Sequence, residues 1–254
     1  MSRPGILCIS LSPIHADARV LRQISVLAEF GDVTTIGFGP HPTGSTTHIE
    51  VPAHLTTLPQ TVSGVLNLGL KRMRASELAA PAIKFALNAL RGKKFDLVVA
   101  NEARVLALAD RVAQGAPIWA DMHEWAPEER THILSWRLLV APLMTYLCRT
   151  YLPRVTATTT VCQSIADLYL ETFDVPTQVM RNSGPFQKLS PSPAVEGKIR
   201  LVHSGAAIHG RDLETTIDVV KALDIKVHGS PMMHDFSLTE KHVVLYDLPR
   251  SEEH

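Results

Sequence analysis

Residues 95–124 read FDLVVANEARVLALADRVAQGAPIWADMHE, and this stretch decides the fold class. Its first seven residues form an apolar run with the composition of a buried strand, and residues 117–121 form a second such run. Between them, residues 103–114 carry leucine, valine and alanine at helical spacing. A strand, a helix and a second strand in this order are typical of a parallel sheet with both faces covered by helices.

The same alternation extends in both directions along the chain. We expect further strands at 5–11, 33–38, 155–161 and 177–181, and helices at 18–30, 62–91, 128–151 and 163–173. Residues 39–60 are rich in Pro, Thr, Gly and His and are expected to be irregular. The pattern predicts an α/β fold with a Rossmann-like, doubly wound parallel sheet.

The alternation is interrupted by NSGPFQKLSPSPAVEGK, residues 182–198, which holds three prolines, two glycines and three serines. This composition is typical of a linker. We therefore expect an N-terminal domain at 1–182, a linker at 183–198 and a second domain at 199–254. The second domain restarts the α/β cycle with strands at 199–205, 225–229 and 242–247 and a helix at about 211–223. Three strands are few for such a domain, so it is expected to be incomplete.

Bulk composition narrows the class of protein. The 254 residues are 45% hydrophobic, with 25 Lys plus Arg against 25 Asp plus Glu, so net charge gives no indication of nucleic-acid binding. Three cysteines far apart in sequence predict reduced thiols in a cytoplasmic protein. The apolar stretch 133–152 contains Arg137, Pro142 and Arg149, which make spanning a membrane costly.

Polar side chains gather where two of the predicted strands end. Asp121, His123 and Glu124 follow one strand, and Asn101 and Glu102 end another. Ligands of open parallel sheets bind beyond the carboxyl ends of the strands, so these residues are candidates for a cleft. The alternative is structural: a histidine satisfied by a carbonyl, an aspartate that caps the next turn and a solvated glutamate.

The loop after the first strand offers further candidates. Asp17 suits a helix N-cap with a first-turn salt bridge to Arg19, and both also match a family pattern described below. Ser12 and His15 are candidates for an acceptor pocket. The histidines show no metal-ligand spacing, so we expect no metal site.

The ordered set of motifs resembles the GT-B glycosyltransferases, in particular glycosyltransferase family 4. The stretches that carry the resemblance are DARVLRQISVLAEFGDVTTI (17–36), the stretch at 95–124, VTATTTVCQSIADLY (155–169), QVMRNSGPF (178–186) and IRLVHSGAAIHGRDLETTIDVV (199–220). The resemblance implies two Rossmann-like domains facing each other. It also implies transfer of a sugar from a nucleoside diphosphate to an acceptor hydroxyl, with retention and without a metal or other cofactor.

The resemblance also implies roles for particular residues. His123 would contact the donor sugar, while Gly205 and Arg211 would hold the donor diphosphate, as a helix start and a guanidinium do. This chain departs from the family by carrying Ala206 where an arginine often follows the turn glycine. It also lacks the family's pair of glutamates eight positions apart, so we expect a donor domain that is truncated.

Other readings remain open. One is a binding module without turnover, and another is a sugar-nucleotide epimerase of the same fold. Residues 71–94 carry seven Lys or Arg against Glu77, with apolar residues between them. This pattern predicts either one or two basic amphipathic helices on the anionic inner face of the cell membrane, where lipid-linked glycan acceptors lie, or a solvated face over a sheet.

Overall fold

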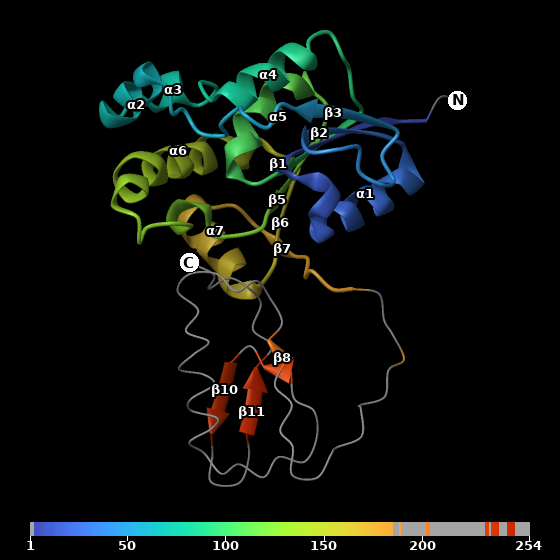
Figure 1. Ribbon diagram of the computed structural model, residues 1–254, viewed down its shortest axis with the longest axis vertical. Coiled ribbons are helices and arrows are strands. Elements are labelled where there is room, and N and C mark those ends of the chain that lie inside the picture. Colours follow the sequence, from blue (N-terminus) through green and yellow to red (C-terminus); the bar gives the residue numbers. More distant parts are fainter. Residues whose placement is uncertain are drawn as a thin grey trace. The chain divides into compact units, whose positions relative to one another are not determined.

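A computed structural model describes residues 3–184 and 188, and in the C-terminal part residues 202–203, 232–233, 235–238 and 243–246. The chain divides into two compact units, of which the first holds Met1–Asn182 and the second Ser183–Glu252 (Figure 1). Each unit is described by itself.

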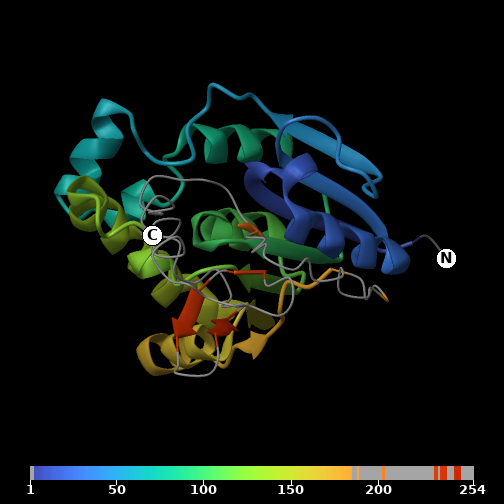
Figure 2. The ribbon, with the colours of Figure 1, turned by 60° about the horizontal axis from the view of Figure 1, so that its bottom comes forward.

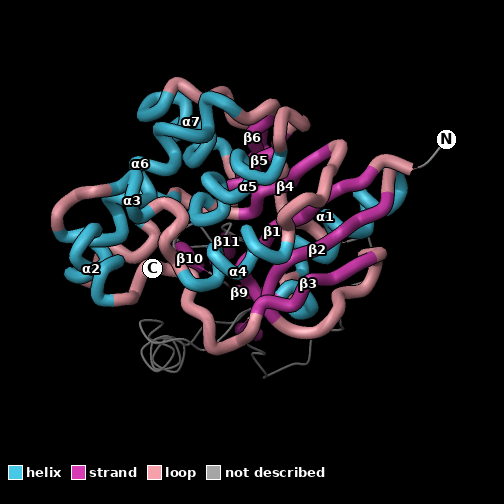
Figure 3. Tube along the Cα trace, turned by 90° about the horizontal axis from the view of Figure 1, so that it is seen from above, coloured by secondary structure: helices cyan, strands magenta, loops and turns pink. Residues whose placement is uncertain are grey.

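The first unit is built on a seven-stranded sheet in which every neighbouring pair of strands is parallel. The strands are, in spatial order, β3 (Thr47–Val51), β2 (Asp32–Phe38), β1 (Gly5–Pro13), β4 (Leu97–Asn101), β5 (Ile118–Met122), β6 (Ala157–Thr160) and β7 (Gln178–Val179). Figure 3 shows the order from β3 to β6. This confirms the predicted doubly wound α/β fold. The chain runs outward from β1 to β3 and then returns to β4 beside β1, which places a topological switch point there.

Seven α-helices connect these strands within the described part of the chain. They are α1 (Ala18–Phe30), α2 (Val62–Gly69), α3 (Met73–Ser76), α4 (Pro81–Ala89), α5 (Leu106–Ala113), α6 (Ala141–Tyr151) and α7 (Gln163–Phe173). Short 3₁₀ turns lie at Ile14–Ala16, Ala103–Val105, Ala126–Glu128 and Leu152–Arg154, and a π-helical turn lies at Trp136–Val140.

Alternating residues of the strands supply two separate cores. Leu7 and Ile9 face a large core that α4, α5, α6 and α7 cover. Ile6 and Cys8 face a smaller core closed by α1. The helix α1 is drawn in blue in Figure 2. Because side chains alternate along a strand, Asn101 and Asp121 fall on the same face as the smaller core. This places two polar strand-end residues under α1.

The structure corrects three of the predicted elements. Residues 39–60 are not wholly irregular, because Thr47–Val51 forms the edge strand β3, and its polar, half-exposed side chains hide the strand pattern. The predicted helix at 62–91 is three helices. The predicted helix at 128–151 begins only after a turn at 129–133 and contains the π-helical segment, which lets Pro142 stand in the first turn of α6 without losing a hydrogen bond.

The apolar residues of the basic stretch at 71–94 pack on the sheet, as the second of its two interpretations, a solvated face over a sheet, predicts. Ile83 and Leu90 are buried in the large core, and Leu78, Phe85 and Leu87 pack against it. Its apolar face is therefore already occupied by this unit's own core. Within the described residues, no helix is both long and apolar enough to cross a membrane.

In the second unit, the described residues form two pairs of strands. β8 (Val202–His203) pairs in parallel with β9 (Met232–Met233), and β10 (Asp235–Leu238) pairs antiparallel with β11 (Val243–Tyr246). β8 and β11 fall inside predicted strands, whereas β9 and β10 are strands that the sequence did not predict. The predicted helix at 211–223 and strand at 225–229 lie outside the described residues.

Candidate functional site

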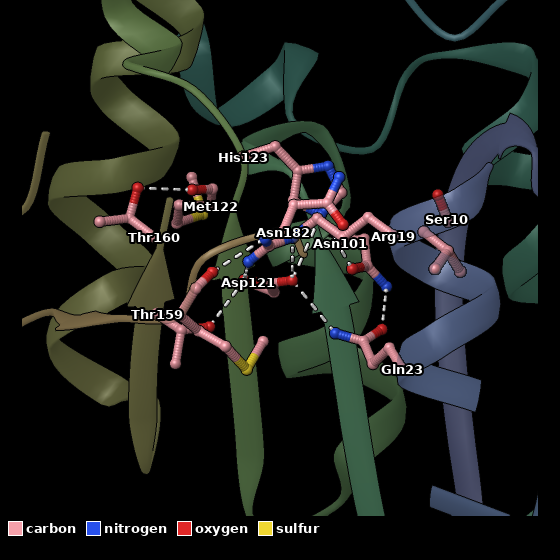
Figure 4. A network of polar contacts seen from close by, with 12 residues as sticks. Ser10, Arg19, Gln23, Asn101, Asp121, Met122, His123, Thr159, Thr160 and Asn182 are labelled. Carbon is pink, nitrogen blue, oxygen red and sulfur yellow. Dashed lines mark hydrogen bonds and ion pairs between the residues drawn. The ribbon is translucent and has the colours of Figure 1, made fainter. Parts of the chain in front are cut away.

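Three neighbouring strands bring their polar residues together at their carboxyl ends (Figure 4). Asn101 of β4 stands in register with Asp121 of β5, and Asp121 stands in register with Thr159 of β6. Asn101 and Asp121 are fully buried, and Thr159 is nearly so. Buried polar groups are stable only when their hydrogen bonds are satisfied, and every one of these side chains has partners.

Asp121 is the centre of this network. The Arg19 guanidinium of α1 donates to both carboxylate oxygens, from Nε at 2.9 Å and from an Nη atom at 2.6 Å. Gln23, one helical turn further along α1, donates at 3.2 Å, and the Thr159 hydroxyl donates at 2.7 Å. A two-pronged arginine–carboxylate pair fixes both partners in one orientation.

This environment keeps the Asp121 carboxylate ionised. Burial by itself would raise its pKa, but hydrogen bonds from His123 and Arg19 and the positive charge of Arg19 outweigh burial and lower the pKa to about 2. The sequence predicted that Asp121 could cap the next turn, and this is wrong. Its carboxylate points back under α1, because its place in the alternation of β5 faces the smaller core.

The hydrogen bonds of this network determine the ring orientation of His123. The backbone carbonyl of Ile9 only accepts, so the Asn101 side-chain atom 3.3 Å from it is the Nδ2 donor. The Asn101 oxygen is then the atom that lies 3.2 Å from His123 Nε2. The Asp121 carboxylate, also an acceptor, lies 3.3 Å from the same nitrogen. Both neighbours of Nε2 therefore accept, and Nε2 must carry a proton.

The other ring nitrogen of His123 is left for a ligand. Nδ1 makes no hydrogen bond within the part of the chain that the structure describes. The His123 side chain is 18% exposed, so the ring is held at its Nε2 edge and open at its Nδ1 edge. A histidine whose tautomer is fixed by a hydrogen bond to its far nitrogen is prepared to accept a proton or a hydroxyl hydrogen at the near one.

A small pocket of about 70 Å³ opens beside His123, lined also by Glu102, Arg104, Glu124 and Glu129. Arg104 donates to both Glu129 oxygens, at 2.6 and 2.7 Å. Burial would lower the pKa of Arg104, but Glu102 and Glu129 outweigh it and raise the pKa. Partial burial beside Glu129 and Glu102 raises the pKa of Glu124. The pocket thus presents several hydrogen-bond acceptors around one fixed cation.

Glu102 has an unusual backbone. Its φ is 77° and its ψ is 158°, a conformation that glycine adopts readily and other residues avoid. The strained residue directly follows β4, and its carboxylate lies 3.8 Å from Arg104 Nε. Strain of this kind is concentrated at binding and catalytic sites, where the surrounding contacts hold it in place.

The loop after β1 confirms one of its two structural predictions, the helix N-cap, and contradicts the other, the first-turn salt bridge. Asp17 is the N-cap of α1 and accepts from the backbone N–H groups of Arg19 and Val20, as predicted. Ser12 donates to Asp17 at 2.9 Å. The predicted first-turn salt bridge is wrong, because the Arg19 guanidinium pairs with Asp121 instead.

His15 is exposed and lies against Gly39, where any side chain would collide with the imidazole ring. The structure therefore brings Asn101, Glu102, Asp121, His123 and Glu124 together, with Ser12 and Asp17 hydrogen-bonded to each other at the start of α1. The predicted diphosphate residues Gly205 and Arg211 lie outside the described residues.

Sequence reasoning missed four residues of this region, Gln23, Arg104, Glu129 and Thr159, and it did not pair Arg19 with Asp121. Arg19 and Gln23 lie four positions apart and so share one face of α1, which is a signal for a common partner. Nothing in the sequence links Arg19 to a carboxylate 102 positions away. Among the described residues, no three side chains of metal-ligating type are placed so that they could hold a metal ion.

Comparison with the sequences of known proteins finds only a short match. No family model matches the chain. A carotenoid cleavage oxygenase of Mycobacterium tuberculosis is 66% identical over 29 residues, which are 11% of this chain and 6% of that protein. The chain therefore spans only a small part of the curated relatives that it matches.

Glycosyltransferases are among the solved structures to which the chain is similar. HepE of Anabaena in complex with UDP-glucose is 16% identical, with a TM-score of 0.42, over 71% of this chain and 44% of HepE. The glycosyltransferase of kitacinnamycin is 12% identical, with a TM-score of 0.49, over 87% of this chain and 64% of that chain. This chain thus spans less than two thirds of the length of either protein.

Proposed function

We propose that the first unit is the acceptor-side half of a glycosyltransferase. In this proposal a sugar passes from a nucleoside diphosphate to an acceptor hydroxyl, with retention, in the synthesis of a cell-surface glycan or glycolipid. The observation that carries the proposal is His123, which stands at the carboxyl end of a central parallel strand with Nε2 held from behind and Nδ1 open. Ligands of such sheets bind at this edge.

The chemistry of sugar transfer suits these residues. A sugar hydroxyl that donates a hydrogen bond needs a fixed acceptor, and His123 Nδ1 supplies one. The buried Arg19–Asp121 pair keeps the His123 ring in place while negative charge develops on the departing diphosphate. Around the pocket, Glu102, Glu124 and Glu129 offer further acceptors for hydroxyl groups.

Negative charge grows on the departing diphosphate, so stabilisation is most useful there. Gly205 and Arg211 are the residues that the family resemblance assigns to this task. Their part in the proposal rests on the sequence pattern alone. A helix start and a guanidinium together suit a diphosphate, since both direct N–H donors at its oxygens.

Binding of nucleotide sugars to the whole 254-residue chain tests the proposal. Calorimetric titration with UDP-, GDP- and TDP-sugars should give saturable binding of one of them. Replacing the hydrogen-bonding ring by His123→Ala should weaken that binding about tenfold, because one charge-assisted or buried hydrogen bond is lost. His132→Ala is the matched control, since His132 is exposed and lies outside the pocket.

Turnover separates the proposal from its alternatives. Transfer of sugar to added acceptors, followed by mass spectrometry, supports the transferase. Saturable binding without transfer or hydrolysis supports a binding module instead, and interconversion of the free sugar nucleotide supports an epimerase. If no nucleotide sugar binds, or if His132→Ala weakens binding as much as His123→Ala, the proposal is wrong.

A further inference from the structure

Two hydroxyl groups hold the backbone on either side of His123. Met122 precedes this residue, and the Thr160 hydroxyl of β6 donates to the Met122 carbonyl at 2.8 Å (Figure 4). Glu124 follows it, and the Tyr169 hydroxyl of α7 donates to the Glu124 carbonyl at 2.8 Å. Thr160 and Tyr169 are fully buried, so neither hydroxyl can turn to water instead. The peptide groups that flank His123 are therefore fixed by the neighbouring strand and by the helix that follows it.

The Tyr169 hydroxyl makes a second contact with the same turn. It accepts from the Ala126 backbone N–H at 3.3 Å, while it donates to the Glu124 carbonyl. A phenol has one proton to donate and can also accept, so both capacities are used. Burial raises the pKa of Tyr169 well above its ordinary value, which keeps the donated proton on the hydroxyl. One side chain thus holds both ends of the turn by which the chain leaves β5.

Aromatic neighbours hold the ring of Tyr169 in place. Trp125, in the same turn, meets it edge-on with ring centroids 4.9 Å apart, and Phe173, one helical turn along α7, lies 6.1 Å away. Trp125 also contacts Phe173, with centroids 5.6 Å apart. Aromatic rings at these distances attract one another. The Tyr169 hydroxyl therefore acts on the turn from a fixed position.

Packing alone does not account for the hydroxyl of Thr160. Valine has nearly the same shape and would fill this buried place in β6 without a polar group that needs a partner. The Thr160 hydroxyl donates to a carbonyl beside His123, whereas the Thr159 hydroxyl donates to Asp121, which contacts the His123 ring. Two successive residues of β6 thus act on the backbone of His123 and on the partner of its ring.

We infer that Thr160 and Tyr169 are positioning residues for His123. Asn101 and Asp121 orient the imidazole ring, and the two hydroxyls fix the backbone from which the ring extends. The open Nδ1 then stands in one place before a ligand arrives, so binding does not have to order it. Ordering a side chain on binding weakens affinity. That the ligand of Nδ1 is a sugar hydroxyl rests on the proposed function.

The rotamer of His123 is the direct test, since it is measured without any ligand. Three-bond couplings to Cγ, recorded by NMR on the 254-residue chain, should report a single χ1 rotamer for His123 in the wild type. Tyr169→Phe keeps the aromatic ring and removes only the hydroxyl. It should give averaged couplings, because the backbone that carries the imidazole is no longer fixed. Thr160→Val should give the same change through the other carbonyl.

Tyr151→Phe is the matched control. Tyr151 is also a buried tyrosine, and its hydroxyl donates to Glu77 at 2.9 Å. Neither Tyr151 nor Glu77 lines the pocket beside His123. This variant loses a hydroxyl of the same kind, and the couplings of His123 should stay those of the wild type. Thermal melts give a temperature at which every variant is folded, and Thr160→Val carries the test if Tyr169→Phe does not fold.

Affinity for whichever of the UDP-, GDP- and TDP-sugars binds gives a second readout. Tyr169→Phe should weaken it about fivefold, the effect of one hydrogen bond. Combining Tyr169→Phe with His123→Ala should weaken it no further than His123→Ala alone, because Tyr169 acts through His123. A tyrosine that only stabilised the fold would leave the affinity of the folded chain unchanged.

A wild-type His123 with averaged couplings contradicts the positioning role, and so does a single rotamer that survives in Tyr169→Phe or Thr160→Val. Averaged couplings in Tyr151→Phe also contradict it, because they indicate a general loosening of the fold. Unchanged affinity in Tyr169→Phe, or additive losses in the double variant, contradicts action through His123. If no nucleotide sugar binds the wild type, the proposed function is wrong, and the couplings of His123 still decide the positioning role.

Discussion

At the scale of single residues, the ring nitrogens of His123 have different roles. Nε2 is enclosed by two acceptors, and Nδ1 is open. We expect ¹⁵N–¹H correlation spectra of the neutral ring to show the proton on Nε2 in essentially every molecule. Asn101→Ala should produce a mixture of tautomers, since one of the two acceptors that hold Nε2–H is removed.

His132 provides the internal reference in the same spectra. Its side chain is exposed, so it should show the mixed pattern of a free imidazole in both proteins. A wild-type spectrum with the proton on Nδ1 of His123 contradicts the assignment, whatever the protein binds.

The buried Arg19–Asp121 pair makes a prediction about stability. Asp121→Asn should lower the free energy of unfolding by about 3–5 kcal/mol, because it leaves a buried guanidinium without its countercharge. The control is Asp32→Asn, which removes an exposed partner of Arg3 and should cost about 0–1 kcal/mol. Urea unfolding at pH 7 measures both values.

The same carboxylate gives a dependence on pH. The pKa of Asp121 is about 2 in the folded chain, below the ordinary value of 3.8. A depressed pKa adds stability above the unfolded value, and that stability is lost as the pH falls from about 4 toward about 2. The difference between wild type and Asp121→Asn should therefore shrink on going from pH 7 to pH 3. A difference that stays constant or grows contradicts an ionised Asp121.

The sequence predicts which strand ends carry these residues, but it does not predict their partners. Asp121 and His123 stand out because polar residues follow a buried strand. Arg19 does not, since its nearest acid in sequence is Asp17, and the choice of Asp121 depends on where α1 crosses β5. Tertiary packing determines where α1 crosses β5, and no local sequence pattern predicts it.

At the scale of elements, the turn after β4 holds strain at Glu102. Glu102→Gly should be about 1 kcal/mol more stable than Glu102→Ala, because glycine adopts the observed φ of 77° without strain and alanine does not. Both variants lose the same carboxylate, so the comparison isolates the backbone. Differential scanning calorimetry of the two proteins gives the difference.

Ser25 supplies the opposite case. It is exposed in the middle of α1, where glycine should be about 1 kcal/mol less stable than alanine. If the Gly–Ala difference has the same sign at both positions, the backbone of Glu102 is not strained.

Elements with strong local signals were predicted well, and those that depend on a neighbour were not. The predicted helix 163–173 coincides with α7, and the apolar runs at β1, β4 and β5 were recognised as strands. β3 was missed because it is a half-exposed edge strand whose residues alternate only weakly. The break before α6 was missed because the apolar residues on both sides continue the same helical pattern.

At the scale of the whole molecule, the chain should separate at the linker that its composition predicts. Limited proteolysis should cut within 183–198 and leave a resistant fragment that ends near residue 182, because the first unit closes its sheet and both cores before that point. Mass spectrometry of the fragments locates the cut. A single resistant species that spans 1–254 contradicts the two-domain prediction.

The exit of the chain from the first unit also has a mechanical consequence. β7 is joined to β6 through only two residue pairs, whereas α1 holds the following backbone through Arg19, which donates to the Met180 carbonyl at 2.9 Å, and through Arg22, which donates to Asn182. A force applied to the chain beyond Asn182 would first load the contact between Arg22 and Asn182. It would then load Met180, which accepts from Arg19 of α1 and donates its own N–H to the Thr160 carbonyl of β6 at 2.7 Å. Rupture would therefore begin at the side-chain contact between Arg22 and Asn182, which can form again when the tension falls.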